Sequence, residues 1–164
     1  MKKIVNPWIE LTDKGYNCFA CAPSNPYGLK MEFYEDGDDI VSFWTPDVNY
    51  QGWLDTLHGG IQATLLDEIG GWIVGRKLQT SGMTTNLNIK YRKPVPCNKD
   101  ATIEIRGRIK NRRLCGGFFR FLKSVHPVCL VVIDQEGDAA AGPGDGICPG
   151  YSGQIGRASC RERV

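Results

Sequence analysis

One carboxylate and two adjacent glycines share a short segment, residues 57–68, in a spacing that suits hydrolysis. Gly59 and Gly60 open a predicted helix, whose first N–H groups have no partner within the helix. Those donors and the positive end of the helix dipole stabilise an oxygen atom that gains negative charge. Asp67 follows Gly60 by seven residues and so lies on roughly the same face of the helix. A carboxylate and an oxyanion site are the groups that ester or thioester hydrolysis requires.

The distance between these groups predicts that two copies of the chain build one site. Helix residues at about 1.5 Å each separate Gly60 from Asp67 by roughly 10 Å. A base and an oxyanion donor must each lie within about 3 Å of the reacting atoms, so one carbonyl does not reach both. Two antiparallel helices related by a twofold axis would bring the glycines of one copy to the aspartate of the other. The alternative is a buried amphipathic helix whose glycines and aspartate have no chemical role.

Hydrophobic spacing predicts one long helix and several antiparallel strands. The helix covers residues 59–75, with a buried stripe formed by Ile61, Leu65, Ile69, Trp72 and Ile73. Alternation of apolar and polar residues predicts a hairpin turn at 35–38 and strands over 29–35, 40–44, 84–92 and 101–109. Residues 3–11 fit a short amphipathic helix. One long helix over an antiparallel sheet is an α+β architecture.

The chain of 164 residues is long enough for one domain with its own core. We expect this domain to cover residues 1–133 and residues 134–164 to be a disordered or non-native tail, since 134–154 are rich in Gly, Ala, Asp and Pro. The net charge of +2 argues against a general attraction to nucleic acid. Apolar runs are too short to cross a bilayer and the N-terminus lacks a signal-peptide core, which predicts a cytoplasmic protein without a membrane partner.

The seven cysteines have irregular spacing and are predicted to be reduced thiols. Cys18 and Cys21 form a CxxC followed by turn residues. Packing in a loop is the favoured interpretation, and no metal is expected because a second CxxC is missing; a metal site or a redox pair are the alternatives. Glu68 points about 100° away from Asp67 around the helix and is predicted to be a solvated charge, with the role of catalytic acid as the alternative.

Five motifs resemble those of one known enzyme family. They are Cys18-x-x-Cys21, Asn25-Pro26-x-Gly28-Leu29, Gln51-Gly52-Trp53, His58-Gly59-Gly60 with Asp67, and Asn86-Leu87-Asn88-Ile89-x-Tyr91-x-x-Pro94. Together they resemble the hotdog-fold acyl-CoA thioesterases of the phenylacetic-acid-degradation (PaaI-like) type. The resemblance covers roughly residues 15–113.

The resemblance implies a fold and a set of site residues. The fold is a hotdog, a long helix wrapped by a curved antiparallel sheet, in homodimers or dimers of dimers. Asp67 is then the catalytic carboxylate, Gly59 and Gly60 supply N–H groups, His58 shapes their loop, and Thr84 stands beside the acid. Some members of the family carry Asn at the position of Gly52. Here a side-chain hydrogen-bond donor to the substrate must come from another residue, and Gln51 is a candidate. The substrate is an acyl-CoA, and neither a cofactor nor a metal is needed.

Basic residues are candidates for binding the phosphates of coenzyme A. With Gln51, Gly52 and Asn86, the substrate-binding candidates are Lys90, Arg92, Arg106 and Arg108. Arg and Lys serve as charge-assisted donors to phosphate. The alternative for these cations is a solvated strand face.

Four functions remain as alternatives at this stage. The chain is an acyl-CoA hydrolase, a non-catalytic acyl-CoA-binding module, a hotdog dehydratase or a CxxC metal or redox protein.

The C-terminal sequence departs from the family. The resemblance stops near Cys115, and residues 155–164 read like translated adapter DNA. We therefore hypothesise a shift of reading frame near residue 115 that removes the closing strands, although 128–133 fits one strand.

Overall fold

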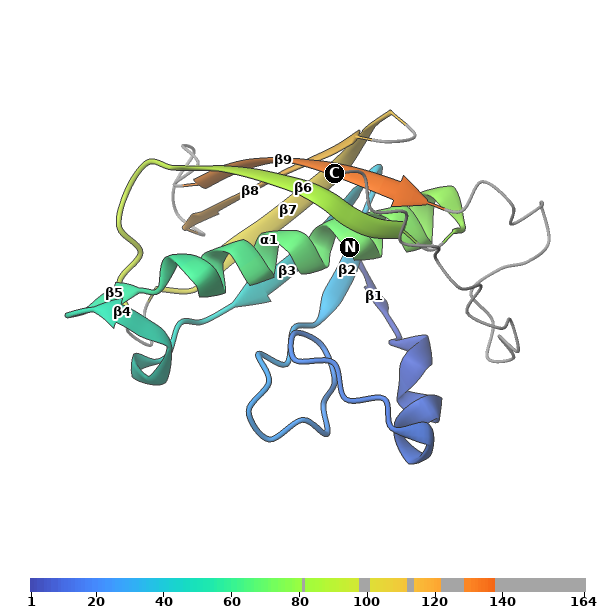
Figure 1. Cartoon of the computed structure of the whole chain (residues 1–164), viewed down its shortest axis with the longest axis horizontal. Coiled ribbons are helices and arrows are strands. Elements are labelled where there is room, and N and C mark those ends of the chain that lie inside the picture. Colours follow the sequence, from blue (N-terminus) through green and yellow to red (C-terminus); the bar gives the residue numbers. More distant parts are fainter. Residues whose placement is uncertain (81, 98–100, 112–113, 122–128, 138–164) are drawn as a thin grey trace, which may run out of the picture.

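The computed structural model describes residues 1–80, 82–97, 101–111, 114–121 and 129–137. Its centre is one long helix, α1 (Gly59–Ile73), that lies across an antiparallel sheet (Figure 1). The strands of this sheet are β1 (Lys2–Ile4), β2 (Phe33–Asp36), β3 (Asp39–Trp44), β6 (Gly82–Tyr91), β7 (Ile103–Asn111), β8 (Leu114–Phe121) and β9 (Cys129–Gly137). Their order is β1-β2-β3-β7-β8-β9-β6, which confirms the predicted α+β architecture.

Short elements connect the helix and the sheet. A two-stranded ribbon of β4 (Gln51–Trp53) and β5 (Thr56–Leu57) leads directly into α1. The short helices are η1 (Pro7–Lys14), η2 (Val48–Tyr50) and η3 (Val74–Leu78), the last a π-type turn that continues α1. Within the described residues, no helix has the length and apolar character needed to cross a membrane.

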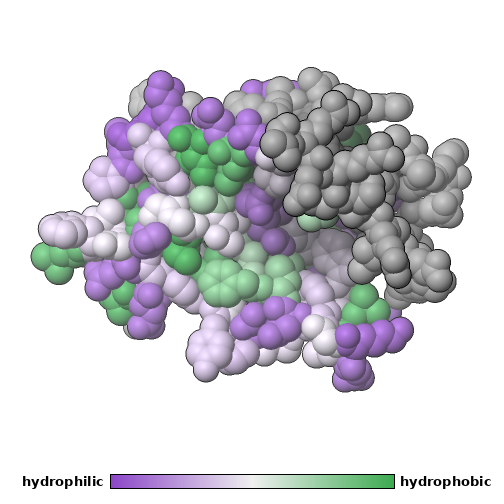
Figure 2. All heavy atoms as spheres, viewed as in Figure 1, coloured by the Kyte–Doolittle hydropathy of each residue, from purple (hydrophilic) through white to green (hydrophobic). Residues whose placement is uncertain are grey.

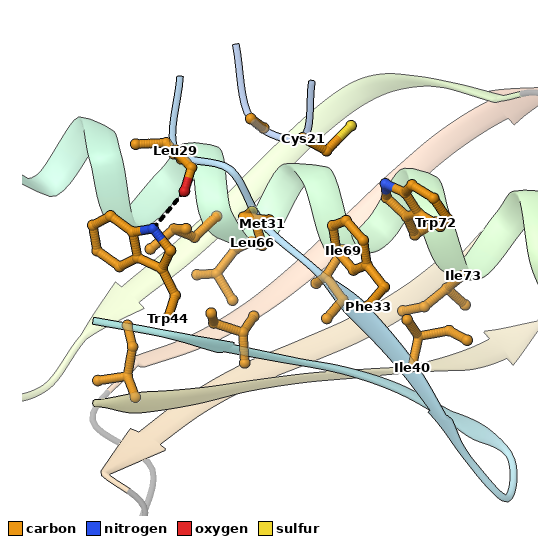
Figure 3. Close-up of a cluster of buried hydrophobic side chains, with 14 of the residues drawn as sticks. Cys21, Leu29, Met31, Phe33, Ile40, Trp44, Leu66, Ile69, Trp72 and Ile73 are labelled. Atoms are coloured by element: carbon orange, nitrogen blue, oxygen red, sulfur yellow. Dashed lines mark hydrogen bonds between the residues drawn. The ribbon is translucent and has the colours of Figure 1, made fainter. Parts of the chain in front are cut away.

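The core lies between α1 and the sheet and extends to the N-terminal segment. Leu65, Ile69, Trp72 and Ile73 of the predicted stripe are buried, Ile61 is only partly buried, and Leu66, which the stripe did not include, is fully buried. Figure 3 shows this cluster, with the Trp44 Nε1–H donating to the Leu29 carbonyl oxygen at 2.8 Å. In the view of Figure 2, hydrophobic residues form separate areas among hydrophilic ones.

The helix approaches the sheet closely at one glycine. A Cβ atom on Gly107 of β7 would lie 2.2 Å from Cδ1 of Ile73, so any side chain at this position would have to displace the end of the buried Ile73 side chain. Gly107 pairs with Gly117 of β8. Both glycines weaken the strand propensity of this region, but neighbouring strands on each side supply the hydrogen bonds of the ladder.

The predicted strand at 29–35 is wrong in its first half. Strand β2 begins only at Phe33, because Leu29 and Met31 donate to the carbonyls of the preceding loop, at Phe19 (2.8 Å) and Ala20 (2.9 Å). Lys30 between them has a left-handed φ of 53°, which interrupts an extended chain.

The other predicted elements form with shifted ends. The hairpin is confirmed, and its turn contains Gly37 at φ 61°. The predicted helix at 3–11 is instead strand β1 followed by η1, since Asn6 caps a new helix by accepting from the Trp8 N–H at 3.0 Å. The expected loss of the closing strands is wrong, because β8 and β9 both form and β9 continues to Gly137. The predicted tail beyond residue 137 lies outside the described residues.

Candidate active site

The start of α1 is capped by a histidine. His58 has extended backbone angles, and its Nδ1 accepts a hydrogen bond from the Gly60 N–H at 2.9 Å. Nδ1 must therefore carry no proton, which leaves the ring proton on Nε2. Because the Gly60 N–H is already used, this geometry argues against Gly60 as an oxyanion donor. In the part of the chain that the structure describes, the Gly59 N–H has no acceptor and remains open.

A hollow of about 380 Å³ lies beside this helix start. Its walls include Gly59, Gln62, Tyr91, Arg92 and Lys93. The Tyr91 hydroxyl donates to the Gly59 carbonyl at 2.9 Å and so ties the end of β6 to the helix start. Two cations therefore stand near an unused N–H group at the positive end of the helix dipole, an arrangement that favours anionic groups.

Asp67 lies farther along α1 and is held by Thr84 of β6. The Thr84 Oγ1 donates to the Asp67 Oδ1 at 2.6 Å, and the Asp67 side chain is partly exposed. The register of β6 against β9 shifts between Thr84 and Asn86, which indicates a β-bulge there. In a regular strand Thr84 and Leu87 face opposite sides, and the extra residue turns Thr84 to the helix side.

Asp67 lines a second hollow, of about 460 Å³. Trp8, Trp72 and Met83 supply its apolar walls, with Thr84 beside the carboxylate. Eight residues of helix separate Gly59 from Asp67, a rise of about 12 Å. In one protomer the acid and the open N–H group thus belong to two different hollows, as the sequence spacing predicts.

Gln51 and Gly52, the two ribbon residues expected to bind substrate, are not among the residues that line the hollow at the helix start. A Cβ on Gly52 would lie 2.8 Å from Cδ2 of His58, so an asparagine there would displace the capping histidine. The Oε1 of Gln51 accepts from the Asp55 N–H at 3.1 Å, which closes the turn of the ribbon. The hollow beside Gly59 is lined by Thr56 of the ribbon and not by Gln51.

Two of the expected phosphate-binding arginines have other partners. Arg106 and Arg108 flank Gly107, whose Cα faces the helix, so they extend from the opposite face of the sheet. Arg106 donates to Asp39 at 2.7 Å and to Asp36 and Glu104 at 2.8 Å, and Arg108 also contacts Asp39. This network argues against their predicted contact with coenzyme A. Among the described residues, neither hollow includes Asn86 or Lys90 in its walls, whereas Arg92 lies at the first one.

The tryptophans also divide between core and surface. Trp44 and Trp72 are buried, and the Trp72 ring stacks on Phe33 with centroids 4.3 Å apart. Trp53 in the ribbon is 79% exposed. Trp72 alone of these three lines a hollow beside a candidate catalytic group.

The prediction of a solvated Glu68 is wrong. Its Oε1 accepts from Trp72 Nε1 at 2.9 Å, and the Cys18 Sγ lies 3.8 and 3.9 Å from its two oxygens. Burial raises the pKa of Glu68. The hydrogen bond from the Cys21 thiol lowers the pKa of Cys18 to about 5, and the same contact together with burial raises that of Cys21. The sequence could not indicate this cluster, because it joins residues 50 positions apart.

Comparison with known families gives one match. The model of the thioesterase superfamily matches residues 54–113, which include the helix start, Asp67 and Thr84. None of the curated proteins compared with this chain matches its sequence.

Solved structures with the same fold include several thioesterases. The thioesterase superfamily protein RHA08564 is 21% identical with a TM-score of 0.62, and the match covers 71% of this chain and 61% of that protein. This chain therefore spans less than two thirds of that protein's length. The E. coli PaaI protein of the phenylacetic acid degradation operon is 13% identical (TM-score 0.59; 66% of this chain, 80% of that one).

A third similar structure was solved with a ligand. It is smu.793 from Streptococcus mutans UA159 bound to acetyl CoA, which is 18% identical with a TM-score of 0.57 over 65% of this chain and 87% of that one. At these identities the likeness concerns the fold, which is the hotdog fold of the thioesterases.

Proposed function

We propose that this protein hydrolyses acyl-CoA thioesters and that Asp67 is its catalytic carboxylate. The observation that carries the proposal is the Thr84–Asp67 hydrogen bond in a hollow that lies along the same helix as the open Gly59 N–H. The match to the thioesterase superfamily covers all three residues. The CxxC and His-Gly-Gly motifs, with PaaI among the similar structures, support the PaaI-like type.

The proposed reaction uses Asp67 in one of two ways. As a base, it removes a proton from a water molecule that attacks the thioester carbonyl; as a nucleophile, it attacks the carbonyl itself to form an anhydride. In both cases the carbonyl oxygen becomes negative and the Gly59 N–H stabilises it, after which the C–S bond breaks and coenzyme A leaves. Thr84 holds the carboxylate in a fixed orientation. The reaction needs no cofactor.

A homodimer joined through β6 would complete this site. β6 is an end strand of the sheet, and among the described residues it pairs only with β9. Near its start Thr84 contacts Asp67, and at its end Tyr91 contacts Gly59. When two such strands pair antiparallel about a twofold axis, the start of one lies opposite the end of the other. Asp67 of one copy then approaches Gly59 of its twin.

The same pairing suits coenzyme A. Arg92 and Lys93 lie beside Gly59, so they would flank the shared site and donate to the phosphates of the substrate. That smu.793 was solved with acetyl CoA supports a ligand of this class.

The experiment measures release of the CoA thiol from a panel of aryl and aliphatic acyl-CoA substrates. We expect Asp67→Asn to lower kcat by roughly 10²–10⁴, the range for loss of a positioned base. Asp13→Asn is the matched control, because Asp13 is exposed on η1. Near wild-type turnover by Asp67→Asn would contradict the mechanism. Tight acyl-CoA binding without turnover by the unaltered chain would favour a non-catalytic binding module instead.

A further inference from the structure

The CxxC motif and Glu68 meet in one cluster that the proposed hydrolysis does not use. The two thiol sulfurs and a Glu68 carboxylate oxygen all lie within 4.8 Å of one another. Cys21 is buried, and Cys18 and Glu68 are half-buried. We propose that Cys18, Cys21 and Glu68 bind one zinc ion, which fastens the loop that carries the cysteines to α1.

The spacing of the three side chains fits a zinc tetrahedron. With Zn–S bonds near 2.3 Å and Zn–O bonds near 2.0 Å, the ligand atoms stand about 3.5–3.8 Å apart. The Cys18 Sγ is 3.8 Å from Glu68 Oε2, and no two of the three ligand atoms are more than 4.8 Å apart, so binding needs the pairs to close by no more than roughly 1 Å. A water molecule would take the fourth position, as it does in zinc sites with three protein ligands.

Hydrogen-bond donors surround the proposed ligands in the way that metal sites require. The Tyr16 hydroxyl lies 3.0 Å from the Cys21 Sγ, and the Asn6 amide lies 3.8 Å from the same sulfur. Trp72 Nε1 donates to Glu68 Oε1, which leaves Oε2 for the metal. Either atom of the Tyr16–Cys21 contact can donate in the free protein, but a zinc-bound thiolate can only accept, so the Tyr16 hydroxyl and the Asn6 amide would then both donate to it and orient it.

Charge also favours a cation at this point. In the part of the chain that the structure describes, no Lys or Arg forms an ion pair with Glu68. Among the described residues, this half-buried carboxylate beside two thiols therefore has no basic side chain in an ion pair with it, and zinc would supply the positive charge. A Cys18–Cys21 disulfide accounts less well for this arrangement, because it would remove both thiols and leave Glu68 without compensation.

Zinc binding would attach the N-terminal loop to α1. Cys18 and Cys21 lie in the loop between η1 and β2, and Glu68 lies on the helix next to Asp67. This loop also covers the helix through buried Leu29 and Met31. The zinc would therefore hold the N-terminal segment, including Trp8 in the wall of the Asp67 hollow, against α1.

The first experiment measures metal content in the full chain, purified under reducing conditions, supplied with zinc sulfate and then desalted. We expect about one zinc per chain for the unaltered protein and its loss in Cys18→Ser, Cys21→Ser and Glu68→Gln. Cys97→Ser is the matched control, since Cys97 is a buried free cysteine outside the cluster, and it should keep its zinc. Asp67→Asn should also keep zinc, which separates this proposal from the proposed hydrolysis.

A second experiment tests the geometry of binding. Cobalt in place of zinc should give a thiolate-to-metal charge-transfer band that Cys18→Ser abolishes. Tyr16→Phe, which removes only the hydroxyl beside Cys21, should weaken zinc binding by about 10–100-fold. Chelation should lower the melting temperature of the unaltered chain by roughly 5–10 °C and leave that of Cys18→Ser unchanged. An unaltered chain that binds no zinc, or zinc that persists in Cys18→Ser and Glu68→Gln, would overturn the proposal.

Discussion

Thr84 donates a hydrogen bond of 2.6 Å to Asp67, although a regular strand would point these two side chains away from each other. The β-bulge between Thr84 and Asn86 makes the contact possible. One extra residue in β6 turns Thr84 to the face of the strand that carries Leu87 and Ile89. These two side chains pack against the core. Bulges commonly re-aim side chains beside active sites, and this one aims a hydroxyl at the candidate acid.

Removing the Thr84 hydroxyl should slow the reaction without unfolding the protein. We expect Thr84→Val to lower kcat by about 10–100-fold, the value of a hydrogen bond to a charged group. Thr84→Ser keeps the hydroxyl and should retain most of the activity. Steady-state kinetics with a thermal melt of each variant checks this result. Equal activity of the Val and Ser variants would show that the hydroxyl does not position Asp67.

The Gly59 N–H can be removed with little strain. Gly59 is the first residue of α1, where proline is tolerated, and His58 before it has φ −57° and ψ 134°, which proline requires of its predecessor. We expect Gly59→Pro to lower kcat by about 10²–10³, as for loss of one oxyanion donor. Gly59→Ala keeps the N–H, and its Cβ meets Tyr91 at an ordinary 3.7 Å, so it should remain active.

The same variant tests whether the site is shared between two copies. Consider a dimer of one Gly59→Pro chain and one Asp67→Asn chain. If the site is shared, one of its two sites combines the intact Asp67 of the Gly59→Pro chain with the intact Gly59 of the Asp67→Asn chain. Co-expression of the two inactive variants should then restore roughly a quarter of the normal activity per site. No recovery in a mixture shown to contain heterodimers would mean that each chain works alone.

Adding a methyl group at Gly107 should destabilise the fold through Ile73. The new Cβ overlaps Ile73 Cδ1, and we expect Gly107→Ala to cost about 1–3 kcal/mol in the free energy of unfolding. Ile73→Val removes that Cδ1 and alone should cost about 0.5–1.5 kcal/mol. Urea unfolding of the double variant should show a cost well below the sum of the two single costs. Simple additivity would contradict the close approach of helix and sheet at this glycine.

The pairing of Asp39 with two arginines should make stability fall in acid. Burial alone would raise the pKa of Asp39, but hydrogen bonds from Arg108 and Arg106 and their charges hold it below its ordinary value. The stabilisation that the ionised Asp39 gives to the fold is therefore complete above about pH 4, which is the ordinary pKa of Asp. It is lost as the pH falls through the lower pKa that Asp39 has in the folded state.

We accordingly expect Asp39→Asn to lower the free energy of unfolding by about 1–3 kcal/mol at pH 7. This cost is smaller than that of breaking a fully buried ion pair, because Arg108 is largely exposed. This cost should shrink as the pH falls below about 4. Urea unfolding of both proteins at several pH values measures the difference, with Asp13→Asn as the control. A cost that stays the same at low pH would exclude the carboxylate charge as its source.

The sequence by itself determined the features that depend on neighbours along the chain. The helix at 59–73, its glycine start and the position of Asp67 follow from periodicity and helix-end chemistry, which act within a few residues. The separation of Gly59 and Asp67 along one helix follows from the fixed rise per residue. The hairpin at Gly37 is predictable for the same reason, because its turn is local.

Only the tertiary structure decided which distant residues meet. The bulge that turns Thr84 to Asp67 depends on the register between β6 and β9, and no alternation within β6 specifies it. Glu68 meets Cys18 across 50 positions, and Arg106 meets Asp39 across 67, so charges that look solvated in the sequence find partners in the fold. Packing between α1, the sheet and the N-terminal loop determines these pairs, since burial makes an unpaired polar group costly.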